Sequence, residues 1–96
     1  MPLVHRKGDK NVVPAPILST PSNTDVYAAG ALLSVDGSPV QSHGVALHGA
    51  CLTANGSSTV FCHGIPVNRV GDADNCGHTR GSYSVYLSQN TVYAGG

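Results

Sequence analysis

The segment SSTVFCHGIPVNRVGD at residues 57–72 contains one copy of each of two patterns that recur along this chain of 96 residues. The first pattern consists of small polar residues, then Val and an aromatic residue, then two residues and Gly. It occurs at Asn23–Gly30, Ser57–Gly64 and Gln89–Gly96. The valines of the three copies, at positions 26, 60 and 92, are 34 and 32 residues apart. This spacing indicates an internal repeat.

The second pattern is a short turn sequence that precedes each copy of the first. It reads Arg-x-Gly-Asp at Arg6–Asp9 and Arg69–Asp72, and a degraded form occurs at Val35–Ser38. The chain therefore consists of three units of one plan within a single domain, residues 1–96. Three similar units predict a pseudo-threefold body, which can close the end of a trimer because each unit can meet one subunit in a roughly equivalent way.

Each unit reads as strands and turns. The β-branched and aromatic runs at Thr59–Phe61 and Ser84–Leu87 predict strands, and turn-forming dipeptides interrupt the chain every few residues. The chain contains 12 Gly and 6 Pro, and only Ala28–Leu33 has a weak helical period. We therefore predict an all-β fold built of three pseudo-repeated units.

The composition predicts a small core and excludes some partners. With no Trp and one Phe, a domain of this size has a marginal core unless something reinforces it. Charged residues make up 10% of the chain and the formal net charge is zero, so we expect no nucleic acid or anionic lipid as a partner. The first ten residues lack the apolar core of a signal peptide, and no apolar run is long enough to span a membrane. We expect synthesis in the cytoplasm.

Four of the five histidines and all three cysteines lie between His43 and His78. Such a concentration indicates a bound transition metal, most often zinc. Cys76 and His78 are two residues apart, so an extended strand would point both to one face, while His43 and His48 flank a turn-prone segment. Three imidazoles and one thiolate form a closed tetrahedral set without a position for a reacting water. We therefore predict a structural metal ion whose binding adds to the folding free energy.

The other histidines and cysteines have simpler interpretations. Cys51 and Cys62 lie in apolar, strand-like stretches and are expected in the core. The odd count of three cysteines fits a closed disulfide framework poorly. His5 and His63 are expected to be exposed or hydrogen-bonded, and His63 is the alternative ligand in place of His78.

These residues resemble those of the PAAR-repeat proteins, the small caps on the membrane-piercing spikes of phage tails and type VI secretion systems. The resemblance rests on the two Arg-x-Gly-Asp turns, on GSSTVFCHGIPVNRVGD at residues 56–72 and on the terminal NTVYAGG, and it covers nearly the whole chain. It implies a short cone of β-strands with three similar faces. It also implies one zinc ion near the tip, held by three histidines and a cysteine.

Mapped onto this sequence, the resemblance assigns the metal ligands to His43, His48, Cys76 and His78. Zinc is the expected ion and iron is the alternative. Two departures concern the middle unit, which lacks Arg and Asp at Val35 and Ser38, and the string that gives the family its name, which here reads PVNR at residues 66–69. Gly37 keeps the middle turn possible, and the second change affects side chains rather than backbone.

The function that the resemblance implies is structural. One chain, a monomer by itself, would cap a trimeric β-helical spike, cover its open strand edges and form a hard point that pierces a target envelope during contraction. In the assembled particle it would lie at the tip of a phage tail spike or a secretion spike and be delivered out of the cell. No small-molecule substrate is expected.

Two other classes of function compete with this one. A zinc hydrolase would need an open coordination position and a general base; the candidates are Asp72 and Asp74, and Asp72 is more simply a turn residue, so we do not expect an enzyme. A free-standing, zinc-stabilised binding or adaptor module would need an exposed groove, which the tyrosines at positions 27, 83, 86 and 93 could line. The repeat-equivalent positions of Tyr27 and Tyr93 instead suggest a shared packing role.

Overall fold

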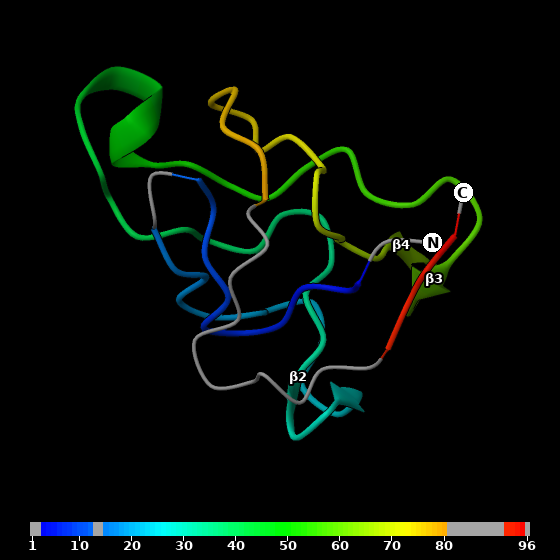
Figure 1. Ribbon diagram of the computed structural model, residues 1–96. Helices are drawn as coiled ribbons and strands as arrows, with labels where there is room; N and C mark the ends of the chain where they lie inside the picture. The colour runs from blue at the N-terminus through cyan, green and yellow to red at the C-terminus, as the bar shows by residue number, and fades with distance from the viewer. Residues whose placement is uncertain (1–2, 13–14, 81–91, 96) are drawn as a thin grey trace.

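The computed structural model describes residues 3–12, 15–80 and 92–95 (Figure 1). Its named strands are short: β1 (Tyr27–Ala28), β2 (Ala31–Leu32), β3 (Phe61–Cys62) and β4 (Ile65–Pro66). One 3-10 helix, η1, covers Ala46–Gly49. The described part of the chain contains no α-helix, and isolated β-bridges supply the remaining pairing. The prediction of an all-β fold is confirmed; the expected strand at Ser84–Leu87 lies outside the described residues.

Two equivalent hairpins follow from the first repeated pattern. Strand β1 pairs antiparallel with β2, and β3 pairs antiparallel with β4. The two turn residues have φ angles of 50° and 87° at Ala29 and Gly30, and of 53° and 78° at His63 and Gly64. Positive φ at both central residues is what a tight type I′ hairpin turn requires, and Gly adopts it without a steric penalty. The weak helical period at Ala28–Leu33 therefore indicated the wrong structure, because this segment belongs to the β1–β2 hairpin.

The Arg-x-Gly-Asp pattern forms turns of nearly identical geometry. The carboxylate of Asp9 accepts hydrogen bonds from the backbone N–H and Nε of Arg6 at 2.9 and 3.1 Å. The carboxylate of Asp72 accepts the same two bonds from Arg69, at 2.8 and 3.1 Å. In the degraded middle unit the Ser38 hydroxyl donates to the Val35 carbonyl oxygen at 2.7 Å instead. Gly37 has a φ of 90°, close to the 94° of Gly8 and the 92° of Gly71 in the other two turns.

A cyclic set of backbone hydrogen bonds joins the three units. Ser34 N–H donates to the His5 carbonyl at 2.9 Å, Asn68 N–H to the Ser34 carbonyl at 3.0 Å, and His5 N–H to the Asn68 carbonyl at 2.9 Å. The residues on either side form bridges in the same cyclic order: Val4 with Arg69, Leu33 with Arg6, and Val67 with Val35. The three units are thus joined in a closed ring, and the three similar faces stay a prediction. The conical outer shape stays a prediction.

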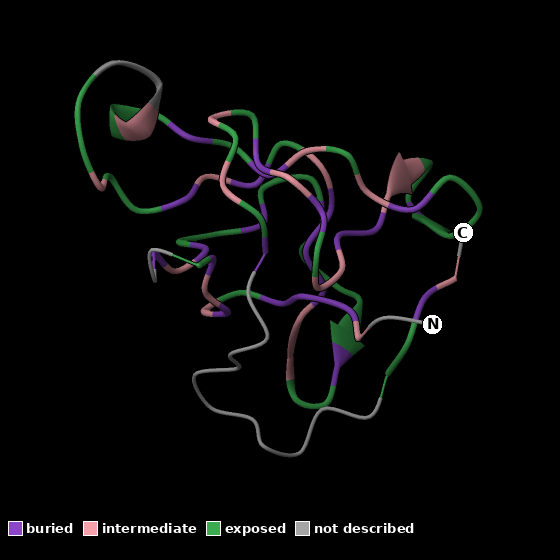
Figure 2. Ribbon diagram, turned by 45° about the horizontal axis from the view of Figure 1, so that its top comes forward, coloured by how far each residue is buried: buried purple, intermediate pink, exposed green. Residues whose placement is uncertain are grey.

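The main core is made mostly of small side chains. Buried positions occur along much of the described chain (Figure 2). Two sets of repeat-equivalent residues and Val35 form the main core: Val4, Leu33 and Val67, and Ala28, Cys62 and Ala94. A second cluster contains Ala15, Val40 and Cys51, with Cys76 packed against it. Cys51 and Cys62 are therefore core residues, as predicted. The first repeated pattern places a small buried residue directly after each exposed aromatic.

The three aromatic positions of the repeat point outward. Tyr27, Phe61 and Tyr93 are 61%, 53% and 54% exposed. The valine before each one is 38%, 36% and 39% exposed, in the same order. The suggested packing role of Tyr27 and Tyr93 was therefore wrong, although their environments are equivalent. Tyr83 and Tyr86 lie outside the described residues.

Candidate metal centre

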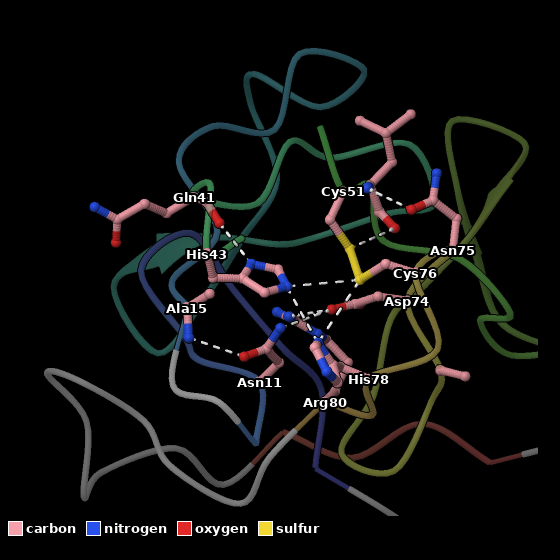
Figure 3. The surroundings of a disulfide bond; sticks show 12 residues. Asn11, Ala15, Gln41, His43, Cys51, Asp74, Asn75, Cys76, His78 and Arg80 are labelled. Atoms are coloured by element: carbon pink, nitrogen blue, oxygen red, sulfur yellow. Dashed lines mark hydrogen bonds and ion pairs between the residues drawn. A yellow bond between two sulfur atoms is a disulfide. The ribbon is translucent and has the colours of Figure 1, made fainter. Parts of the chain in front are cut away.

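Four side chains converge on one point at the surface of the second core cluster. His43, His48, Cys76 and His78 each offer one ligand atom, and these atoms all lie within 4.8 Å of one another. The sequence predicted these four residues, and the structure brings them together (Figure 3 labels three of them). Two separate segments of the chain supply them, one around η1 and one around residues 74–78. A different set of backbone hydrogen bonds bends each segment.

The first segment is closed by its own backbone. His43 N–H donates to the His48 carbonyl at 3.0 Å, and His48 N–H donates to the Val45 carbonyl at 3.1 Å. A Cβ added at Gly44 would lie 3.0 Å from the Cβ of His48, so glycine leaves the space that the two rings need. The expectation that a short loop brings His43 and His48 together matches this geometry.

The ring of His43 is oriented by a backbone carbonyl. Its Nδ1 lies 2.8 Å from the Gln41 carbonyl oxygen. A carbonyl can only accept, so Nδ1 must carry the proton, and Nε2 is left with a free lone pair directed at the other ligands. A histidine that donates its second nitrogen to a carbonyl is the usual arrangement at a protein metal site.

The second segment is a turn, not the extended strand that the sequence suggested. Gly77 N–H donates to the Asp74 carbonyl at 3.0 Å, and Asp74 N–H donates to the His78 carbonyl at 2.7 Å. Gly77 has a φ of 93°, which a residue with a side chain rarely adopts. This left-handed residue between Cys76 and His78 turns both side chains toward His43.

The distances between ligand atoms match those of a tetrahedral ion. Nε2 of His43 lies 3.1 Å from Nδ1 of His78, and Sγ of Cys76 lies 3.7 and 3.8 Å from these two nitrogens. Tetrahedral zinc, with bonds of about 2.0 Å to nitrogen and about 2.3 Å to sulfur, separates two nitrogens by about 3.3 Å and a nitrogen from a sulfur by about 3.5 Å. An ion placed between the three atoms would need only small adjustments.

His48 supplies a second argument for an ion. Its Nδ1 is buried and has no hydrogen-bond partner among the described residues. A buried polar atom without a partner costs about 1–3 kcal/mol, and buried nitrogens of this kind are uncommon in native structures. The His48 ring stacks on that of His78 with centroids 4.7 Å apart. Three imidazoles and a sulfur are the donor set that zinc prefers, and the residues therefore fit the ion.

Cys76 also has a second partner, which the sequence did not predict. Cys76 and Cys51 form a disulfide with their Cα atoms 5.7 Å apart (Figure 3). Because a metal ligand must be a thiolate, this cross-linked form and the metal-bound form of Cys76 are different chemical states. The odd cysteine count concealed the pair: Cys62 is the free cysteine, buried in the other core cluster.

A buried ion pair between Arg80 and Asp74 stabilises the second segment. Nη2 of Arg80 lies 2.6 Å from Oδ2 of Asp74, and neither side chain is exposed. Nδ2 of Asn11 donates to the same oxygen at 3.2 Å. Burial lowers the pKa of the Arg80 guanidinium, and the charge of Asp74 opposes that shift. Asn75 exchanges two hydrogen bonds with Leu52, at 3.0 and 2.9 Å, and so ties this turn to the segment that carries Cys51.

His63 does not join the metal cluster. It occupies the first turn position of the β3–β4 hairpin, and its Nε2 lies 2.6 Å from Oδ1 of Asp25 in the neighbouring unit. The alternative ligand is therefore not supported, and the expectation of a hydrogen-bonded His63 holds. Asp72 forms an ion pair with Arg69, and Asp74 forms one with Arg80.

The metal cluster and the hairpins lie in different parts of the molecule. Figures 1 and 2 both show η1 on the left of the molecule, away from the two hairpins.

Comparison with known proteins adds no assignment: the chain matches no family model and no curated protein. In the described part of the chain, no helix has the length and apolar character needed to cross a membrane.

Proposed function

We propose that this chain is a structural cap of the PAAR type, which closes the threefold end of a trimeric β-helical spike and carries one zinc ion that stabilises its tip. The observation that carries the proposal is the threefold arrangement within one chain. The His5, Ser34 and Asn68 hydrogen bonds form a closed cycle, and each unit carries an exposed aromatic at the equivalent position of the repeat. A single chain with this property can present one similar surface to each subunit of a trimer.

The three valine–aromatic pairs are the proposed contact with the spike. They are exposed apolar side chains at repeat-equivalent positions, and aromatic residues are the side chains most enriched at protein interfaces. Two of the pairs lie at strands β1 and β3, and the third lies at the isolated bridge between Tyr93 and Leu3. An edge strand of the spike could extend this pairing. The spike in turn would have its own open strand edges covered.

The metal cluster supports the second half of the proposal. A closed set of three histidines and one cysteine supplies no open position for a substrate, so its contribution is stability. The core consists mostly of Val, Ala and Cys, and a bound ion would add folding free energy that such small side chains cannot provide. For a part that transmits force to an envelope, resistance to unfolding is the relevant property. The host machine would be a phage tail or a type VI secretion system.

The test is assembly with candidate spike trimers, measured by co-elution and native mass spectrometry. We expect one chain per three spike subunits. The triple variant Tyr27→Ser, Phe61→Ser, Tyr93→Ser should lose the complex and keep its fold, because all three side chains are more than half exposed. Val45→Ser is the matched control, since Val45 is 82% exposed but lies beside the metal cluster. Binding of three chains per trimer, or full binding by the triple variant, would contradict the proposal.

A free-standing zinc-stabilised binding or adaptor module is the second candidate. One observation favours it: an open pocket of about 580 Å³ lies beside Tyr27 and is lined in part by Lys7 and Leu18. A module of this kind would bind a glycan or a peptide at that pocket as a single chain. Binding that is lost in Leu18→Ser and unaffected by Phe61→Ser would favour the module over the cap, because a cap should depend on all three units.

A further inference from the structure

We propose that Cys51 is a redox partner of the metal centre: the Cys51–Cys76 disulfide and the metal ion compete for one sulfur atom. The inference rests on the proposed metal site and adds its regulation. In the reduced chain, Cys76 is a thiolate ligand. In the oxidised chain, the same sulfur is bonded to Cys51 and the ion is released.

The first observation is that the backbone suits both states. With the disulfide in place, the Cα atoms of Cys51 and Cys76 are 5.7 Å apart, a usual distance for a disulfide. In the same conformation, Sγ of Cys76 still lies 3.7 Å from Nε2 of His43 and 3.8 Å from Nδ1 of His78. The sulfur can therefore change partner without movement of the chain.

The second observation is that Cys51 is fixed beside this sulfur. Its side chain is 1% exposed, and its carbonyl accepts a hydrogen bond from Val40 N–H at 2.9 Å. The reciprocal bonds between the adjacent residues Leu52 and Asn75 hold the two segments together. Cys51 is absent from the set of side chains that can share one ion. The sulfur of Cys51 can therefore bond to the sulfur of Cys76 without itself being one of the four proposed ligands.

The loss of one ligand explains why the two states exclude each other. A disulfide sulfur carries no negative charge and is a poor ligand compared with a thiolate. Oxidation would leave three neutral imidazoles, an incomplete version of the closed set. Removing even a hydrogen-bonding partner of a ligand typically lowers metal affinity by about 10–100-fold, so the loss of a ligand itself should exceed about 100-fold. Conversely, a bound ion holds the Cys76 thiolate and should slow its oxidation.

The oxidant is a disulfide, either of a small thiol or of a disulfide oxidoreductase. The Cys76 thiolate, leaving the metal, attacks one sulfur of the oxidant and displaces the first thiolate. Cys51 then loses its proton and attacks the mixed disulfide at Cys76, which displaces the second. One S–S bond breaks and one forms, two electrons pass to the oxidant, and the Cys51 proton leaves with one of the two product thiols. The metal ion enters solution.

The experiment compares zinc-loaded wild type with Cys51→Ser and Cys62→Ser during incubation with oxidised glutathione. A chromogenic chelator measures released zinc, and mass spectrometry of alkylated peptides maps the disulfide. Wild type should lose its zinc as the Cys51–Cys76 link appears. Cys51→Ser can lose zinc only through a mixed disulfide between Cys76 and glutathione. When reduced glutathione is also present it reverses this mixed disulfide, so the variant should keep zinc at least about tenfold longer than wild type, because it lacks the thiol that makes the exchange go to completion. Cys62→Ser should behave as wild type, since burial raises the pKa of Cys62 and makes it a poor nucleophile.

A second measurement needs no variant. Zinc added in excess to the reduced wild-type chain should slow formation of the Cys51–Cys76 link by about tenfold or more, because bound thiolate is withdrawn from exchange. Equal zinc loss from wild type and Cys51→Ser, or a mapped disulfide with a full equivalent of zinc retained, would overturn the inference while leaving the metal site intact. Reduced wild type that binds no zinc would overturn both proposals. Loss of zinc with the disulfide formed only in wild type supports the inference.

Discussion

Nε2 of His43 lies 3.1 Å from Nδ1 of His78, although the two residues are 35 positions apart in the chain. The Gln41 carbonyl holds the proton of His43 on its other nitrogen, so Nε2 can accept either a hydrogen bond from His78 or a metal ion. The nearby sulfur of Cys76 and the buried, unpartnered Nδ1 of His48 favour the ion.

The reduced protein should contain about one equivalent of tightly bound zinc, because a closed set of three histidines and one cysteine binds zinc strongly. A strong chelator should lower its melting temperature by about 10 °C or more, since each 1 kcal/mol shifts the melting temperature of a domain this small by about 4–8 °C. Elemental analysis and thermal melting measure both. His78→Gln should abolish the chelator effect, and His63→Gln is the matched control because His63 lies outside the cluster. Less than about one equivalent would count against the site.

Gly77→Ala should weaken zinc binding and destabilise the chain. The φ of 93° at Gly77 costs a residue with a side chain about 1–2 kcal/mol, and relief of this strain would separate Cys76 from His78. Gly49→Ala is the control: its added Cβ would meet only the Gly44 carbonyl oxygen, at 3.5 Å. Chemical unfolding and zinc competition should show a loss for the first variant alone. Equal effects of the two variants would mean that the turn does not position the ligands.

Asp74→Asn should be strongly destabilising. The change removes the negative charge that pairs with the buried guanidinium of Arg80, and a buried charge left without its partner costs about 3–5 kcal/mol. Asp25→Asn removes an exposed carboxylate that pairs with His63 and should change the free energy of unfolding by less than about 1 kcal/mol. Urea unfolding of the two variants provides the comparison. A small effect at Asp74 would show that water reaches Arg80.

The contribution of Asp36 to the free energy of unfolding should decrease as pH rises through the acid range. Burial raises the pKa of Asp36 above its ordinary value of 3.8, opposed by hydrogen bonds from Asn68 and Gly56 and reinforced by the charge of Asp72. A raised pKa means that the folded state holds this proton more tightly than the unfolded state, so its contribution to stability is present at low pH and is lost as pH rises through the folded-state pKa. Asp36→Asn should remove this component from the pH dependence of urea unfolding. An unchanged pH profile would contradict the assignment.

The sequence predicted what depends on repeated local patterns. The Gly8, Gly37 and Gly71 turns and the three units follow from residue types at fixed spacings. The grouping of His43, His48, Cys76 and His78 follows from their residue types and the family resemblance, since the spacing of Cys76 and His78 suggested a strand where the structure has a turn. The β1–β2 hairpin was partly hidden, because Ala29 takes the left-handed turn position that Asn or Gly usually marks. The disulfide could not be predicted, since Cys51 and Cys76 are 25 positions apart and are brought together by tertiary contacts such as those of Leu52 with Asn75.

The repeated sequence pattern also did not predict that the side chains of Tyr27 and Tyr93 point outward. The residue after each aromatic is small and packs in the main core, as at Ala28 and Ala94, and because successive side chains of an extended segment point to opposite faces, the aromatic before it faces outward. Equivalent positions predicted equivalent environments, and this part of the interpretation is confirmed. Whether these equivalent positions are buried or exposed depends on how the three units pack together, which the repeat alone does not specify.

The backbone cycle of His5, Ser34 and Asn68 has a consequence for how this molecule forms. The cycle is complete only when all three segments are in place, because each segment donates to one neighbour and accepts from the other. During synthesis the cycle cannot close until Asn68 has left the ribosome, and we expect such non-local closure to slow folding. In the closed cycle each unit is tied by backbone hydrogen bonds to both of its neighbours, so we expect a load applied to one unit to be shared with the other two.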